Sequence, residues 1–112
     1  MQILVETDKN IAWTDELNER LTAKLRSAAN KYQDRITRIQ VHLTDVNKDK
    51  GGSHDKRCVI EARPAGLDPI AVNHNASTVE LAIDGAAARL GNLLDSRFGR
   101  LNSDRGARPV ID

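Results

Sequence analysis

Alternating apolar and polar residues predict four β-strands along the chain. Residues 2–6 form the first and shortest of these patterns. Residues 37–43, 57–63 and 70–74 follow, and their alternation is typical of strands with one buried face. The connections between the last three strands suit hairpins but not a crossover. These three strands should therefore form an antiparallel meander.

Apolar residues spaced three and four apart predict two amphipathic helices. The first begins after Thr14, a good N-cap residue, and runs to about Tyr32. Its apolar stripe consists of Leu17, Leu21, Leu25, Ala28 and Tyr32. The second opens with a capping box between Ser77 and Glu80 and should end near Gly99, a natural C′ residue. Its stripe consists of Val79, Ile83, Ala86, Leu90, Leu94 and Arg97.

The element order β-α-β-β-β-α predicts an α+β two-layer sandwich. Neither helix can bury its apolar stripe alone, so both should cover one face of a four-stranded sheet. A length of 112 residues allows one domain, assigned here to residues 1–101, while residues 102–112 are expected to form a disordered tail. The other sheet face should be open to solvent. It would carry Arg38, Gln40, His42, Arg57, Glu61 and Arg63.

The formal net charge of +1 conceals a basic segment in and after the first helix. Between Arg20 and Arg38 there are six basic residues and one acidic residue, which gives a local charge of +5. At helical spacing, Arg20, Lys24 and Lys31 lie along one flank of the apolar stripe. The second helix is less basic, with Arg89 and Arg100 on one flank. Any affinity for nucleic acid must therefore come from local clustering.

Two interpretations of these basic residues remain open. Lysine and arginine side chains beside an apolar stripe commonly solvate a helix surface without binding anything. Alternatively, they contact RNA phosphates in a salt-sensitive and sequence-tolerant way. Base stacking is disfavoured, because the chain has only three aromatic residues. The candidate RNA contacts are Arg20, Lys24, Lys31, Arg35, Arg89, Arg97 and Arg100.

Metal or catalytic chemistry has little support in the sequence. The histidines His42, His54 and His74 do not stand at metal-ligand spacing with each other or with Cys58. Cys58 lies on the apolar side of its strand and fits a small core residue, although a nucleophilic Cys/His pair stays open. The acidic and glycine-rich stretch 45–55 lacks the pattern of a calcium loop. We predict no catalytic residue, no metal or other cofactor and no small-molecule substrate.

Several properties fit a cytoplasmic protein. A single cysteine cannot form an intramolecular disulfide and suits a reducing compartment. The N-terminal residues do not resemble a signal peptide. No apolar run approaches the roughly 18 residues of a membrane span, so no membrane association is expected.

Several short strings, in this order and spacing, resemble one known family. They are Thr14-Asp15-Glu16-Leu17, Thr22-Ala23-Lys24, Asp34-Arg35-Ile36-Thr37, Ala82-Ile83-Asp84 and Arg89-Leu90. The chain resembles the ribosome hibernation promoting factor and ribosome-associated inhibitor family, also known as sigma-factor modulation or ribosomal subunit interface proteins. The resemblance covers about residues 1–100. It is that of a short form, because long-form members carry an additional C-terminal domain that this sequence does not reach. Two departures indicate a divergent member: the family's second helix continues with a dense basic run where this chain has residues 91–96, and the insert 48–56 is longer and more polar than usual.

The resemblance implies a fold similar to a double-stranded RNA-binding domain. It also implies a protein that is not an enzyme and that binds the small ribosomal subunit and its RNA, in the channel used by mRNA and tRNA. Such binding would block translation in stressed cells. Lys24 and Arg89 fall on basic family positions. The alternative is a regulatory protein-interaction module of the same fold, with a protein partner at the open sheet face.

Overall fold

The computed structural model describes residues 1–46 and 55–106, of which 100–106 are described by their backbone alone. In chain order the elements are β1 (Gln2–Thr7), α1 (Asp15–Ala28), the 3₁₀ helix η1 (Asn30–Arg35), β2 (Ile36–Asp45), β3 (Lys56–Pro64), β4 (Ile70–Ala76) and α2 (Val79–Gly106). The order of elements and the α+β class predicted from the sequence are confirmed. The likeness to a double-stranded RNA-binding domain stays a prediction.

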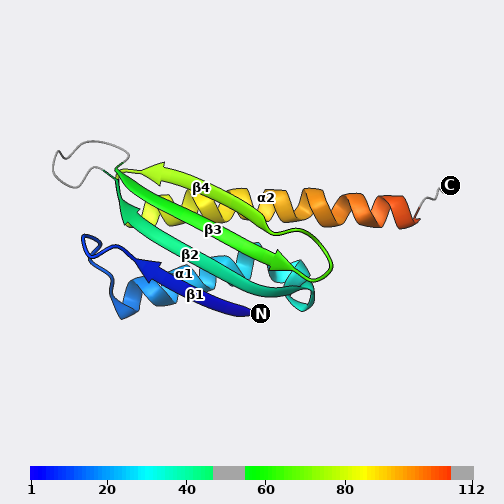
Figure 1. Ribbon diagram of the computed structural model, residues 1–112, viewed down its shortest axis with the longest axis horizontal. Helices are drawn as coiled ribbons and strands as arrows, with labels where there is room; N and C mark the ends of the chain where they lie inside the picture. The colour runs from blue at the N-terminus through cyan, green and yellow to red at the C-terminus, as the bar shows by residue number, and fades with distance from the viewer. Residues whose placement is uncertain (47–54, 107–112) are drawn as a thin grey trace.

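The four strands form one mixed sheet in the order β1-β2-β3-β4. The last three strands make the predicted antiparallel meander, in which Val41 lies opposite Ile60 and Ile60 opposite Val72. β1 instead pairs with β2 in parallel, with Val5 beside Val41. A parallel neighbour requires a crossover, and α1 supplies it. Both helices lie on the same side of the sheet, as Figure 1 shows.

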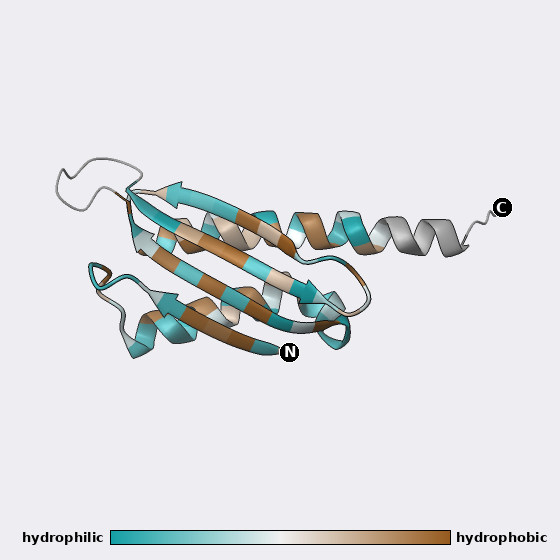
Figure 2. Ribbon diagram, in the orientation of Figure 1, coloured by the Kyte–Doolittle hydropathy of each residue, from teal (hydrophilic) through white to brown (hydrophobic). Residues whose placement is uncertain are grey.

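The core lies between the sheet and the two helices. Hydrophobic and hydrophilic residues alternate along β2 and β3, as Figure 2 shows. The hydrophobic members of this alternation, among them Ile39, Val41 and Ile60, are buried beneath the helices. The helices contribute Leu21, Leu25 and the stripe of α2. That stripe consists of Ala82, Ile83, Ala86, Leu90, Leu94 and Phe98. The residues between the core positions of the strands, most of them polar, make up the opposite, open face of the sheet.

The predicted bounds of α1 were wrong at the C-terminal end. The helix ends at Ala28, and the chain continues as η1 with a non-helical residue, Tyr32. The spacing from Ala28 to Tyr32 imitates one more α-helical turn. Tyr32 instead turns its ring toward Phe98 of α2, which favours the tighter 3₁₀ path over a continued α-helix. The predicted N-cap is confirmed, since Leu17 N donates to Thr14 Oγ1 over 3.1 Å.

The ends of α2 also differ from the prediction. The cap is Thr78 rather than Ser77, because Leu81 N donates to Thr78 Oγ1 at 3.1 Å. The helix passes Gly99 and continues to Gly106, so the first residues of the predicted tail are helical. A single glycine does not by itself end an α-helix, because it costs only about 1 kcal/mol relative to alanine. Residues 107–112 lie outside the described part.

The strands extend slightly beyond the predicted ranges. β2 reaches Asp45, and the chain returns at Asp55, whose carbonyl accepts a hydrogen bond from Val46 N at 2.8 Å. Lys56 joins this end of the sheet, with Nζ 3.3 Å from Asp45 Oδ2 and 3.2 Å from Asp55 Oδ2. These contacts close the base of the loop, whose residues 47–54 lie outside the described part.

Candidate nucleic-acid interface

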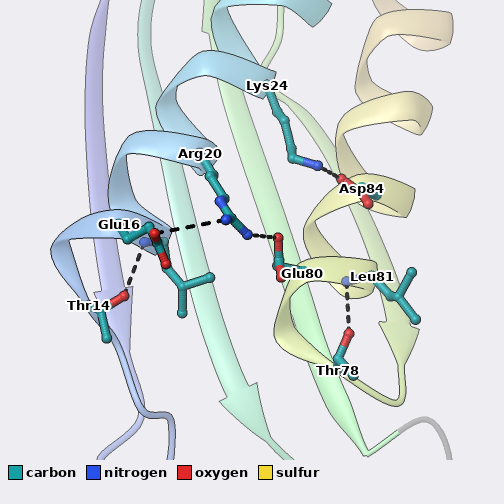
Figure 3. A network of polar contacts seen from close by, with 9 residues as sticks. Thr14, Glu16, Arg20, Lys24, Thr78, Glu80, Leu81 and Asp84 are labelled. Carbon is teal, nitrogen blue, oxygen red and sulfur yellow. Dashed lines mark hydrogen bonds and ion pairs between the residues drawn. The ribbon is translucent and has the colours of Figure 1, made fainter.

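The basic flank of α1 faces an acidic flank of α2. Arg20 Nη1 lies 2.5 Å from Glu80 Oε2, and Lys24 donates to the carboxylate of Asp84 (Figure 3). Glu80 and Asp84 are four residues apart, as are Arg20 and Lys24, so the helices run in the same direction with matching spacing. We call these contacts, with the one at Lys31 below, the interhelical ladder.

These pairs lie at the surface. The side chains of Arg20 and Glu80 are 49% and 45% exposed, and those of Lys24 and Asp84 are 35% and 46% exposed. The hydrogen bond and negative charge of Glu80 raise the pKa of Arg20 above its ordinary value. Exposed pairs of this kind contribute little to stability, because water screens the charges and ordering both side chains costs entropy. The ladder therefore orients side chains more than it holds the fold together.

Further along, the two helical segments meet through an aromatic cluster. The rings of Tyr32 and Phe98 stack with their centroids 4.7 Å apart, and Arg35 Cζ lies 5.4 Å from the Phe98 centroid. The Tyr32 hydroxyl donates to Asp95 at 2.6 Å, and Lys31 Nζ lies 3.8 Å from the same carboxylate. Asp95 therefore holds the distal part of α2 against η1.

Arg89 lies on the other flank of α2. It lines an open groove of about 430 Å³ between α2 and the edge strand β4. The other lining residues are Ala71, Val72, Asn73, Asn92, Leu93 and Ser96. The Arg89 side chain is exposed, and no carboxylate in the described part of the chain forms an ion pair with it. Arg89 is therefore free to meet an anion from solution.

The other two arginines of the predicted set lie where α2 outruns the sheet. Arg97 is half-buried, and the prediction that it continues the apolar stripe was wrong, because Phe98 takes that core position. Arg97 forms no ion pair with any residue in 1–46 or 55–99. Arg100 is in the helix, but its side chain lies outside the described residues. The predicted set thus does not form one patch. Its described members divide into the ladder, the Phe98 cluster and the two arginines of α2 without an ion pair in the described part, Arg89 and Arg97.

The remaining candidate chemistry has structural roles. Burial raises the pKa of the Cys58 thiol to about 12, which keeps it protonated and unreactive. His74 lies against α2 at Gly85, where an added Cβ would stand 2.1 Å from its Cδ2. Within the described ranges, no three histidine, cysteine, aspartate or glutamate side chains gather to hold a metal ion. His54 lies outside the described residues.

The comparisons with known proteins agree with this architecture. A profile of the family described as sigma 54 modulation protein / S30EA ribosomal protein matches residues 4–102. The chain belongs to this family. No curated protein matches it closely enough to report.

Two solved structures share the S30EA fold of this chain. One is the N-terminal domain of Protein Y from Thermus thermophilus, at 24% identity and a TM-score of 0.64, covering 87% of this chain and 94% of that one. The other is a ribosomal subunit interface protein from Coxiella burnetii, at 20% identity and a TM-score of 0.68, covering 88% and 99%. The family description names modulation and ribosomal proteins rather than an enzyme class. In the described part of this S30EA protein, no helix is long and apolar enough to cross a membrane.

The prediction from sequence missed the acidic half of the interhelical ladder in this S30EA protein. Glu80, Asp84 and Asp95 share one flank of α2 by the same spacing rule that grouped the basic residues of α1. The signal was therefore present. Pairing it with α1 required the relative direction of the two helices, which local sequence spacing does not contain.

Proposed function

We propose that this protein is a ribosome-associated translation inhibitor, a hibernation factor, that binds RNA of the small subunit through basic side chains of its helix layer. The description of its family includes a ribosomal protein, and one solved structure of the same fold is a ribosomal subunit interface protein. The observation that carries the RNA contact is Arg89, an exposed guanidinium on α2 with no carboxylate partner in residues 1–46 and 55–99.

The free and paired cations play different parts in this proposal. Arg89 and Arg97 can bind a phosphate directly, without first releasing a carboxylate, and Arg100 follows them in the same helix. Arg20, Lys24 and Lys31 must first exchange a carboxylate for a phosphate. Because their pairs are exposed and weak, this exchange is within reach of a polyanion. Arg35 lies over Phe98, where its planar group keeps donors free for an oxyanion.

Such an interface would read the shape and charge of RNA rather than its bases. The three aromatic rings cannot form a stacking platform, because Tyr32 and Phe98 stack on each other. Folded RNA presents its phosphates at fixed positions, which guanidinium groups recognise without a sequence code. Specificity for the ribosome would then come from several phosphates whose fixed positions match the positions of the basic side chains.

The test is equilibrium binding of the labelled protein to purified small subunits. Arg89→Gln and Arg97→Gln should each weaken binding, by roughly fivefold, and lower the slope of log affinity against log salt by about 1. Arg26→Gln is the matched control. Arg26 is exposed on α1, on the flank away from α2, and its loss should leave the salt slope unchanged.

A translation assay tests the biological half of the proposal. The wild-type protein should slow synthesis by purified ribosomes, and Arg89→Gln should require more protein for the same effect. If Arg89→Gln and Arg26→Gln bind subunits equally well, the helix layer is not the interface. Capture of one stoichiometric protein by a chain that does not bind subunits would favour the protein-interaction module instead.

A further inference from the structure

We propose that the open face of the sheet carries a second RNA-phosphate site, built on Arg38 of β2 and Arg63 of β3. This inference rests on the proposed function in choosing RNA as the partner. The proposed site is distinct from the helix-layer interface, because it lies on the side of the sheet opposite the helices (Figure 1). We call the two residues the cross-strand arginine pair.

The register of the sheet brings these two cations together. Arg38 stands directly opposite Arg63, and Gln2 of β1 stands on the other side of Arg38. Ile39 and Ala62, the neighbours of the pair, are fully buried beneath the helices, so both arginines point to the open face. Directly opposite residues in antiparallel strands have Cβ atoms about 5 Å apart, and like charges at that position repel.

The local acids do not neutralise the cross-strand arginine pair. Glu61 is the acidic residue that contacts it in the described part, with Oε1 3.5 Å from Arg63 Nη2. Glu6, the other acid on this face, interacts with His42 and Gln40 instead, at 3.2 Å and 3.4 Å. Glu61 thus pairs with Arg63, and among the described residues no carboxylate forms an ion pair with Arg38.

Arg38 shows directly that its hydrogen-bonding capacity is not met. Its Nε atom is buried and has no hydrogen-bond acceptor among the described residues. A buried donor of a charged group without an acceptor is costly, and folded proteins rarely keep one. An oxyanion between Arg38 and Arg63 would accept from the terminal Nη groups of both side chains and screen their mutual repulsion. The buried Nε has almost no solvent-accessible surface, so it fixes the Arg38 side chain in an unsatisfied setting and is not itself the anion contact.

The composition of the open face favours RNA over a protein partner. Protein interfaces depend on a central cluster of large apolar or aromatic side chains. On this face of the described strands, Leu4 is the one exposed large apolar side chain, at 37%, and no strand residue is aromatic. A polar surface with paired guanidinium groups suits the phosphate backbone, which both arginines can contact bidentately.

The experiment compares Arg38→Gln and Arg63→Gln with Arg57→Gln in binding to purified small subunits across a salt series. Arg57 lies on the same face but opposite Thr44, so it is a matched control without a cross-strand cation. Arg38→Gln and Arg63→Gln should each weaken binding by roughly fivefold and lower the salt slope by about 1, with the slope of Arg57→Gln unchanged. Loss of the repulsion should leave both variants at least as resistant to urea as the wild type.

The outcomes separate this inference from the proposed function. If Arg89→Gln weakens binding while Arg38→Gln and Arg63→Gln do not, the sheet site is overturned and the helix-layer interface stands. If the wild type does not bind subunits, titration with a short RNA hairpin decides, monitored through the Nε–Hε NMR signals of Arg38 and Arg63. Saturable shifts of both signals support the sheet site without the ribosome, and unchanged signals overturn it. If Arg38→Gln and Arg63→Gln leave RNA binding unaltered but abolish the capture of a protein partner, the RNA site on the sheet is also overturned.

Discussion

Lys24 of α1 forms an ion pair with Asp84 of α2, one turn beyond the pair of Arg20 with Glu80. In the proposed function, the carboxylate of Asp84 occupies the place where a phosphate would bind. An acidic side chain that competes with the ligand lowers affinity without being needed for the fold. In the proposed function, the acidic side chains of the ladder therefore compete with RNA for the basic side chains of α1.

Asp84→Asn should therefore bind small subunits more tightly, by roughly two- to fivefold, because Lys24 is released and a negative charge is removed. The free energy of unfolding in urea should change by less than about 1 kcal/mol, since both side chains are more than one-third exposed. Glu19→Gln is the matched control: it removes an exposed acid from the flank of α1 away from α2. Equal affinities for these two variants would contradict a role for Lys24.

Gly85 should be intolerant of alanine because of His74. The new Cβ would stand 2.1 Å from Cδ2 and 2.4 Å from Nε2 of the imidazole, so the ring or the helix must move. We expect a loss of about 1–3 kcal/mol in unfolding free energy, beyond the helix-propensity gain of alanine. Gly99→Ala is the control, since nothing lies within 4 Å of its added Cβ. It should be neutral or stabilising by up to about 1 kcal/mol.

A double variant separates the contact from general helix damage. If the clash with His74 causes the loss, Gly85→Ala should cost less in a His74→Ala background than in the wild type. An equal cost in both backgrounds would show that the imidazole is not the obstacle.

Tyr32 should make stability fall at high pH. Its hydrogen bond to Asp95, followed by burial and the charge of that carboxylate, raises the pKa of the Tyr32 hydroxyl above its ordinary value of 10.0. A raised folded-state pKa means that the stabilisation is fully present below pH 10 and is lost as pH rises through the folded value. Tyr32→Phe should be less stable by about 0.5–1.5 kcal/mol near neutral pH. The difference in unfolding free energy between the wild type and Tyr32→Phe should disappear as pH rises above 10. A difference that stays constant with pH would contradict this role of the Tyr32 hydroxyl.

Cys58 should resist thiol reagents while the protein is folded. Burial raises its pKa to about 12, so at pH 8 the thiolate fraction is on the order of one in ten thousand. Labelling with a disulfide reagent should be slow in the native protein and fast in concentrated urea. Fast labelling under native conditions would contradict the burial of this strand residue and revive the nucleophile hypothesis.

Local patterns were enough to predict the sheet and the choice of open face. Alternation separated Ile39 and Ile60, which are fully buried, from Arg38 and Arg63, which face solvent. The end of α1 could not be predicted this way, because Tyr32 continues the helical spacing. Its actual path depends on Phe98, which is far away in the sequence. Tertiary contacts overrode a local pattern.

The candidate site was harder to predict than the fold. Spacing correctly grouped Arg20 with Lys24 but gave no partner for either. Whether a surface cation is free or paired depends on which helix lies beside it and in which direction. Arg89 differs from Lys24 for this reason alone: its flank of α2 faces the edge strand rather than α1.

The most direct test of ribosome binding is co-sedimentation of the wild-type protein with purified small subunits at increasing salt. The account predicts stoichiometric pelleting at low salt that falls steeply as salt rises, because phosphate contacts release counterions. Pelleting should weaken further when Arg89 and Lys24 are both changed to glutamate. Protein that remains in the supernatant at the lowest salt, with the subunits intact in the pellet, would contradict the account.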